Sequence, residues 1–259
     1  MDEPIKMELR EGVAVVTLNR PKAYNAFGPI MIEALTETFF KLTGDPDVLG
    51  VIITGAGRAF CAGANLKRLA EYGKPYGRAF HSLASKYHQV IIEIRRMPKP
   101  VVAAINGLAA GGGLSMALAC DFRVMVKSAL LRQAYTSNGL SIDGGGTYTL
   151  PRMVGMARAM EIAGLDRPIS PEQALAWGLV TELAEDDRSV EAARKIIEEV
   201  WRRPLSSFAA AKKLITDSFD TSFEAQLEKE RELLTWCADH PNGIEGITAF
   251  IEKRKPVYV

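Results

Sequence analysis

Cysteine and histidine are both scarce in this chain, with three of each among 259 residues. The cysteines, Cys61, Cys120 and Cys237, are widely spaced and odd in number, which argues against a disulfide framework and for a reducing compartment. The histidines form no metal-ligand spacing with these cysteines. We therefore expect no zinc site and no other bound metal.

An excess of one charge and long apolar runs are also missing. The chain has 32 basic and 31 acidic residues, so its net charge of +1 gives no electrostatic reason to expect nucleic acid or an anionic membrane as a partner. No apolar run approaches membrane-spanning length, and the opening MDEPIKMELREG lacks the apolar core of a signal peptide. We expect a cytoplasmic location.

Three common nucleotide-binding and nucleophile motifs are absent. Gly55 and Gly57 follow an expected strand, but the third glycine position of a dinucleotide fingerprint holds Phe60. The glycines at 107 and 111–113 lack the Lys-Ser/Thr pair of a phosphate-binding P-loop, and no serine lies in a G-x-S-x-G motif. A Rossmann site, a P-loop and a hydrolase nucleophile elbow are therefore disfavoured.

Expected strands and helices alternate along most of the chain, which indicates an α/β core. The expected strands cover residues 13–18, 48–54, 101–105 and 121–126. The expected helices of this part cover residues 29–43 and 77–97, the second ending at a Pro-Lys-Pro sequence. Beyond about residue 185 the pattern becomes that of amphipathic helices, over 189–202, 204–219 and 221–239.

The most informative segment covers residues 101–121, VVAAINGLAAGGGLSMALACD. A β-branched run leads to an Asn-Gly turn, three consecutive glycines and a helix of small residues. Such a helix N-terminus leaves backbone N–H groups without acceptors, and these donors can hold negative charge that develops on oxygen. The alternative is that the glycines only permit close packing of strand and helix.

Four stretches together resemble the crotonase (enoyl-CoA hydratase/isomerase) superfamily: NRPKAYNAF at 19–27, GAGRAFCAGANL at 55–66, KPVVAAINGLAAGGGLSMALACD at 99–121, and LPRMVGMARAMEI at 150–162. The resemblance implies an α/β fold, a spiral of ββα units over residues 1–200, followed by a helical trimerisation region over 201–259. It implies a homotrimer or a dimer of trimers. It also implies an acyl-CoA thioester as the substrate, so that coenzyme A is no separate cofactor.

Carried over residue by residue, the resemblance places the two oxyanion donors on the backbone N–H groups of Ala64 and Gly112. Two donors on a thioester carbonyl stabilise an enolate or a tetrahedral species. The resemblance further implies that the nucleotide end of the thioester lies near Phe250 and Lys253. The remaining substrate contacts it implies are Lys22, Ala23, Asn25, Ala62, Asn65, Leu66, Tyr87, Gly111, Ser115 and Tyr135.

The chain departs from the hydratases of this family at two positions. A hydratase carries glutamates three and twenty-three residues after the oxyanion glycine, where this sequence has Ser115 and Tyr135. Unperturbed hydroxyls titrate far above pH 7, so neither is a good general base near neutral pH. The two-carboxylate hydration mechanism is therefore disfavoured.

Asp143 and His88 are the remaining candidates for the chemistry. Asp143 matches a position where several branches of the superfamily have an aspartate, among them some enoyl-CoA isomerases and 4-chlorobenzoyl-CoA dehalogenase. The alternative is a structural role for Asp143, as a turn or helix-capping residue. His88 matches the catalytic histidine of the dehalogenase, and otherwise is a half-buried helix residue. Ile142 departs from the dehalogenase, which has asparagine there. With Tyr87 and Tyr135, these matches indicate a pocket for a ring.

Three hypotheses follow from these residues. The first is an isomerase- or lyase-like reaction through an enolate, with Asp143 moving the proton. The second is a hydrolytic dehalogenation or a related aryl-CoA substitution, in which Asp143 attacks the ring and His88 activates water. The third is a catalytically idle crotonase fold that binds acyl-CoA or a protein partner.

Overall fold

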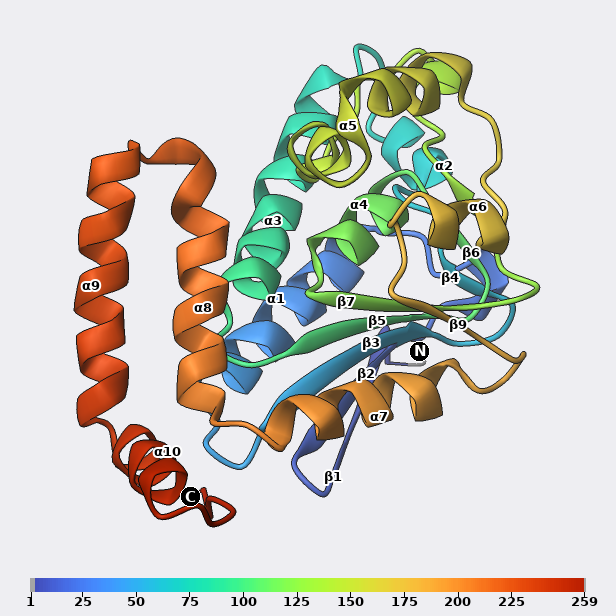
Figure 1. Cartoon of the computed structure of the whole chain (residues 1–259). Coiled ribbons are helices and arrows are strands. Elements are labelled where there is room, and N and C mark those ends of the chain that lie inside the picture. Colours follow the sequence, from blue (N-terminus) through green and yellow to red (C-terminus); the bar gives the residue numbers. More distant parts are fainter. Residues whose placement is uncertain (1–2, 259) are drawn as a thin grey trace.

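The computed structural model describes residues 3–258 (Figure 1). Its centre consists of two β-sheets whose strands are mostly parallel. The larger sheet has six strands, antiparallel only at the first pair, in the spatial order β1 (Ile5–Arg10), β2 (Val13–Leu18), β3 (Gly50–Gly55), β5 (Val101–Ile105), β7 (Phe122–Val126) and β9 (Glu182–Ala184). The smaller sheet orders β4 (Ala59–Cys61), β6 (Leu108–Ala110) and β8 (Leu131–Arg132).

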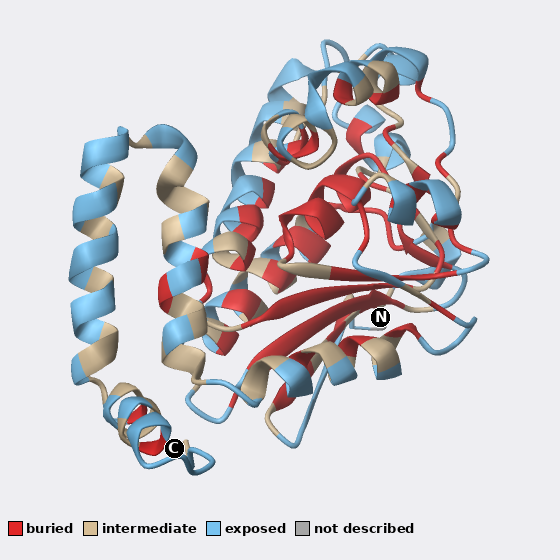
Figure 2. Cartoon of the chain, viewed as in Figure 1, coloured by how far each residue is buried: buried red, intermediate tan, exposed pale blue. Residues whose placement is uncertain are grey.

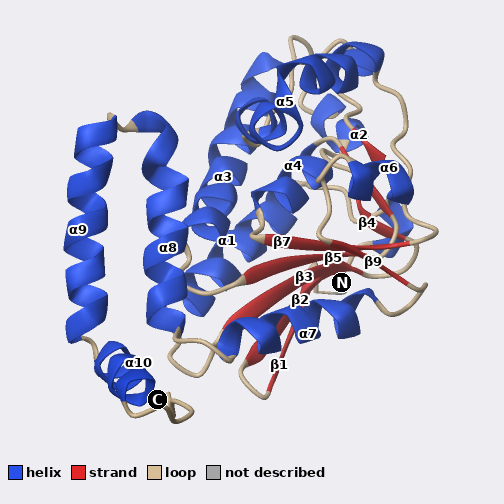
Figure 3. Cartoon of the chain, viewed as in Figure 1, coloured by secondary structure: helices blue, strands red, loops and turns tan. Residues whose placement is uncertain are grey.

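The chain repeats a ββα unit that contributes one strand to the larger sheet and one strand to the smaller sheet. Each of β3, β5 and β7 is followed by a short strand of the smaller sheet and then by helices, as the strand and helix colours in Figure 3 show. This arrangement confirms the spiral of ββα units. The helices of the spiral are α1 (Pro29–Gly44), α2 (Leu66–Ala70), α3 (Gly77–Arg96), α4 (Gly112–Ala119), α5 (Gly146–Leu165) and α6 (Pro171–Ala176).

The central strands β3 and β5 of the larger sheet are buried on both faces, as their red colour in Figure 2 shows. One face packs against the helices of the spiral, and the opposite face is covered by α7 (Ser189–Trp201), whose Ala193 and Ile197 contact Ile52 and Val102. Strands buried on both faces are apolar at every position. This explains why β5 reads as the uninterrupted run VVAAI.

The last three helices extend away from the sheets (Figure 1). They are α8 (Leu205–Asp217), α9 (Phe223–Asp239) and α10 (Pro241–Ile251), and α9 has no buried residue within the described chain. Large apolar side chains are exposed on them, among them Leu234, Phe250 and Ile251. Such a surface is typical of a contact with another protein chain.

Within residues 3–258, every helix is too short or too polar to span a lipid bilayer.

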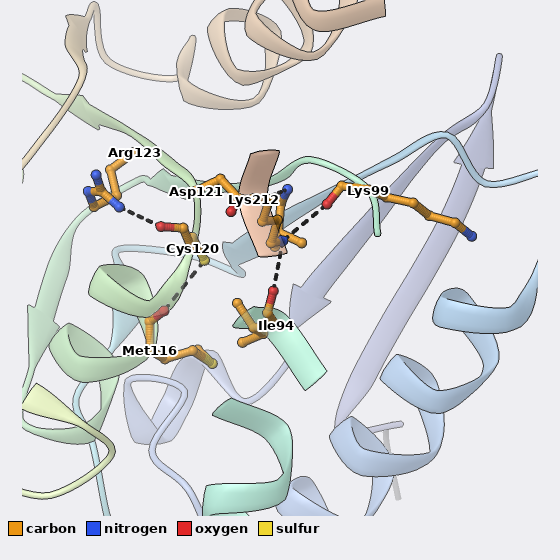
Figure 4. A network of polar contacts seen from close by, with 8 residues as sticks. Ile94, Lys99, Met116, Cys120, Asp121, Arg123 and Lys212 are labelled. Atoms are coloured by element: carbon orange, nitrogen blue, oxygen red, sulfur yellow. Dashed lines mark hydrogen bonds and ion pairs between the residues drawn. The ribbon is translucent and has the colours of Figure 1, made fainter. Parts of the chain in front are cut away.

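A buried ion pair attaches α8 to the core (Figure 4). Lys212 Nζ lies 2.8 Å from Asp121 Oδ2 and donates to the carbonyl oxygens of Ile94, at 3.1 Å, and Lys99, at 3.2 Å. Asp121 Oδ2 also accepts from the Val101 N–H at 2.8 Å. Burial raises the pKa of Asp121 and lowers the pKa of Lys212, so each charge depends on its partner in this low-dielectric position.

Replacing Lys212 with methionine is expected to lower the free energy of unfolding by about 3–5 kcal/mol, because it leaves the Asp121 carboxylate buried without a cation. Urea denaturation at one fixed protein concentration measures this change. The control is Lys213→Met on the same helix, where the lysine is exposed and the expected change stays within about 0.5 kcal/mol. Equal losses in the two variants would contradict the role given to the ion pair.

Candidate active site

The glycine-rich segment and the loop after β4 meet at a cavity of about 380 Å³. This volume lies within the range of small-molecule pockets. Phe27 and Tyr87 form part of the wall, with ring centroids 4.9 Å apart. The lining residues are Phe27, Ala62, Ala64, Leu66, Phe80, His81, Leu83, Ala84, Tyr87, Gly111, Gly112, Ala134, Tyr135, Asn138, Leu140, Ser141, Ile142 and Asp143.

The N–H of Ala64 is free to bind a ligand. Ala64 forms an isolated parallel bridge with Phe27, in which the Phe27 N–H donates to Gly63 O at 2.7 Å and Phe27 O accepts from Asn65 N–H at 2.8 Å. This pairing uses the residues on either side of Ala64 and directs its own N–H away from Phe27. Within residues 3–258 that N–H has no acceptor, and Ala64 lines the cavity.

The N–H of Gly112 is the second free donor. Gly112 is the first residue of α4, so its N–H has no partner inside the helix, and none elsewhere in the described chain. A Cβ at Gly63 would lie 3.0 Å from Gly112 N, and a Cβ at Gly113 would lie 2.1 Å from Cys61 O. Glycine at these two positions therefore allows the two loops to touch, which brings both donors to one wall of the cavity.

Asp143 and His88 form a pair beside these donors. His88 Nε2 lies 2.5 Å from Asp143 Oδ1, and this oxygen also accepts from the Gly144 N–H at 2.7 Å. Asp143 lines the cavity, whereas His88 does not. Asp143 Oδ2 has no hydrogen-bond partner within residues 3–258. Asp143 Oδ1 is thus held by hydrogen bonds, and Oδ2 is available to accept a proton.

Hydroxyl groups hold the main chain around this carboxylate. The Ser115 hydroxyl donates to Asp143 O at 2.7 Å, and the Tyr135 hydroxyl contacts both Ser115 and the main chain of Asp143. The Tyr87 hydroxyl donates to Gly112 O at 2.5 Å. Burial raises the pKa of both tyrosines well above the ordinary value, so both stay protonated and neither is a base near neutral pH.

A family model described as enoyl-CoA hydratase/isomerase matches residues 8–259, nearly the whole chain. The chain belongs to the enoyl-CoA hydratase/isomerase family. It is 33% identical to 1,2-epoxyphenylacetyl-CoA isomerase of Escherichia coli K12, with 100% of this chain and 99% of the relative covered. It is 32% identical to 4-chlorobenzoyl coenzyme A dehalogenase-1 of an Arthrobacter species, with 97% and 92% covered.

The solved structures agree with this membership. The crystal structure of an enoyl-CoA hydratase from Polaromonas sp. JS666 superimposes with a TM-score of 0.93 at 35% identity, covering 98% of this chain and 99% of that one. These relatives of one family therefore include proteins named as an isomerase, a dehalogenase and a hydratase.

Eight of the site residues predicted from the sequence of this family member line the cavity: Ala62, Ala64, Leu66, Tyr87, Gly111, Gly112, Tyr135 and Asp143. Ser115 is buried directly behind them. Asn65 is the N-cap residue of α2, and its side chain accepts a hydrogen bond from the Arg68 N–H at 3.1 Å. The structure thus brings together residues that are up to 81 positions apart in the chain, from Ala62 to Asp143.

Asn25, a predicted substrate contact, does not line the cavity. Its side chain is fully buried, donates to Ala56 O at 3.0 Å and Ala59 O at 2.8 Å, and accepts from the Arg20 N–H at 2.8 Å. These bonds fix the loop that leads into β4, so the side chain has no free polar atom for a ligand. Lys22 and Ala23 lie on the neighbouring short helix and do not line the cavity.

Phe250 and Lys253 are not brought to the cavity by their own chain. Phe250 is on α10 and Lys253 just beyond it, and none of the described cavity-lining residues comes from α8, α9 or α10. In Figure 1, α10 lies far from α2 and α4, which flank the cavity.

Sequence reasoning missed several cavity residues, chiefly His81 and Phe80 near the start of α3. His81 lies seven residues before His88, on the same side of α3. His81 lines the cavity, whereas His88 is not among the lining residues and contacts Asp143. Residues 3–258 hold no cluster of His, Cys, Asp or Glu that fits a metal ion.

Proposed function

We propose that this family member is an acyl-CoA isomerase or lyase that works through an enolate. The observation that carries the proposal is the position of Asp143. Among the described residues that line the cavity it is the single carboxylate, and it shares the cavity with the free N–H groups of Ala64 and Gly112. One base and one oxyanion hole are what an enolate reaction needs.

In the proposed reaction the thioester carbonyl accepts from Ala64 and Gly112. Asp143 Oδ2 removes a proton from the carbon next to that carbonyl, or from its vinylogous position, and the electron pair moves onto the carbonyl oxygen as an enolate. The two N–H groups stabilise this charge. The Asp143 side chain is 34% exposed, so its carboxyl exchanges the proton with solvent water and then protonates the other carbon. The double bond shifts, and the product has the same composition as the substrate. In the lyase variant the enolate expels a leaving group from the β carbon with its bonding electron pair, and the carbonyl and an α,β double bond re-form. The Asp143 carboxyl then gives its proton to the departing group.

The residues at the two hydratase positions argue against hydration. Ser115 hydrogen-bonds to the main chain of Asp143, and Tyr135 remains a neutral phenol because burial raises its pKa. Neither group can remove a proton from water near neutral pH. Hydration by two carboxylates therefore lacks both of its bases here.

The active assembly in this proposal is a homotrimer or a dimer of trimers, with no cofactor besides the coenzyme A of the substrate. The exposed apolar side chains of α9 and α10 favour an assembly of this kind. It would also allow Phe250 and Lys253 of one chain to approach the thioester bound by the next.

A second candidate function is an aryl-CoA substitution such as dehalogenation. The pairing of His88 with Asp143, together with 32% identity to a 4-chlorobenzoyl coenzyme A dehalogenase, favours it specifically. In that reaction Asp143 Oδ2 attacks the ring and halide leaves. Water then cleaves the aryl ester, its proton passing to His88. The two reactions use the same carboxylate, as a base in one and a nucleophile in the other.

Turnover of a small thioester panel separates the two functions. The panel contains a 2-enoyl, a 3-enoyl, a cyclic dienoyl and a 4-chlorobenzoyl coenzyme A, and products are analysed by mass spectrometry. From the unsaturated thioesters we expect either isomers of unchanged mass, separated from the substrate by liquid chromatography, or, for a lyase, two smaller products. Release of chloride with a trapped aspartyl ester would support the second function instead. Gain of one water, or no turnover of any member, would contradict the proposal.

Replacing Ser115 with alanine is expected to lower kcat about 5-fold while KM stays unchanged, because the variant loses the hydrogen bond that holds Asp143 O. The measurement is steady-state kinetics on the thioester with the fastest turnover in the panel. Ser85→Ala is the matched control, since the Ser85 hydroxyl bonds only to His81 O within its own helix. A rise in KM at constant kcat would show that Ser115 acts in binding and not in positioning Asp143.

A further inference from the structure

The cavity has a second polar end that the proposed reaction does not use. Along α3, Tyr87 contacts Gly112 and His88 contacts Asp143, so this part of the helix marks the reacting end. His81 lines the cavity one heptad earlier. At 1.5 Å per residue, the step from His88 to His81 covers about 10 Å along the helix axis. A group bound at His81 therefore lies well beyond the thioester carbonyl.

The polar groups that face the cavity from this helix and from the loop before Asp143 are His81, Asn138 and Ser141. The Asn138 amide is already used, since it donates to Ala134 O at 2.8 Å. The side chains of His81 and Ser141 have no hydrogen-bond partner within residues 3–258. An imidazole that faces a binding cavity with both nitrogens free can donate to an oxygen of the ligand.

The charges of the lining residues indicate which kind of ligand oxygen can bind at His81. Among the described lining residues there is no lysine and no arginine, so an anionic group at this end would have no strong cationic partner. A neutral hydroxyl or carbonyl oxygen needs only one good donor. The aromatic side chains Phe27, Phe80 and Tyr135 line the same cavity, and flat walls of this kind suit a ring.

Resting on the proposed function, we infer that His81 is a specificity-determining residue. It donates a hydrogen bond to a neutral hydroxyl or carbonyl oxygen at the far end of a cyclic acyl group. The substrate class is thereby narrowed to thioesters whose ring carries an oxygen substituent opposite the linkage to the carbonyl.

Isothermal titration with two thioesters tests this inference without relying on turnover. The probes are phenylacetyl-CoA and 4-hydroxyphenylacetyl-CoA, which differ by the single oxygen and contain no double bond to shift. We expect the wild type to bind the hydroxylated thioester about 2- to 10-fold more tightly, the range of one partly exposed hydrogen bond. His81→Leu is expected to remove this preference, so that the variant binds the two thioesters with equal affinity.

Two further variants complete the design. His81→Gln keeps a side-chain donor and is expected to retain part of the preference, while Gln89→Ala, exposed on the same helix and outside the cavity, is expected to retain all of it. Equal affinities in the wild type, or a preference unchanged in His81→Leu, would overturn the inference alone. Failure of the wild type to bind either thioester would contradict the proposed function as well.

Discussion

Replacing Gly112 with proline is expected to lower kcat by about 10²–10³, the loss seen when one oxyanion donor is removed. The substitution deletes the N–H and puts a ring carbon where the oxyanion would accept it. Proline is compatible with the first position of a helix, which Gly112 occupies in α4. The preceding Gly111 lacks a Cβ to clash with the new ring. We therefore expect the variant to fold, and thermal unfolding with circular dichroism checks that it does.

Gly112→Ala is the matched control for this variant. It retains the N–H, while its new Cβ lies 3.1 Å from Phe27 Cε2, so the ring has to shift by a few tenths of an ångström. We expect a much smaller loss of kcat than in Gly112→Pro. Equal kcat for the proline variant and the wild type, in a folded protein, would contradict the assignment of the oxyanion hole. Equal losses in both variants would show that crowding, and not the donor, causes the effect.

Replacing Asp143 with asparagine is expected to reduce kcat by about 10²–10⁴, the usual contribution of a positioned general base. Asparagine has nearly the same shape, and its carbonyl oxygen can still accept from the Gly144 N–H. The variant therefore keeps the local fold and loses the atom that takes the proton. Kinetics on the thioester selected from the panel measures the change in kcat.

Asp187→Asn is the control for the change of charge. Asp187 is exposed, lies outside the cavity and has a φ of +63°, a left-handed conformation that asparagine adopts readily. We expect the kcat of this control to equal that of the wild type. An Asp143→Asn variant that is as active as this control would remove Asp143 from the chemistry and leave the cavity without a base.

The core of the fold could be predicted because its local signals are strong. The apolar run at 101–105 coincides with β5, and the helix expected over 29–43 is found as α1, Pro29–Gly44. β1 was not predicted, although its sequence IKMELR alternates apolar and charged residues, and one of its six residues is buried. The short strands β4, β6 and β8 have two or three residues each, too few for a periodic pattern to develop.

The site could be predicted only in part, for a different reason. The oxyanion residues lie in glycine-bearing loops with a distinctive composition, so sequence similarity locates them. The orientation of α3 leaves no such signal. Only the packed structure shows that His88 contacts Asp143 from outside the cavity while His81 lines it. A buried asparagine that fixes a loop, as Asn25 does, has the same local sequence as one that binds a ligand, so the sequence alone does not distinguish the two.

The central claim is that Asp143 moves a proton while Ala64 and Gly112 hold an enolate. The most direct measurement is the uptake of solvent deuterium by a 3-enoyl-CoA incubated with the enzyme in D₂O, with the labelled carbon located by NMR. We expect deuterium at the α or γ carbon, and an uptake at least about 100-fold slower in Asp143→Asn. Turnover of a thioester without any deuterium on carbon, or uptake that persists unchanged in Asp143→Asn, would contradict the claim.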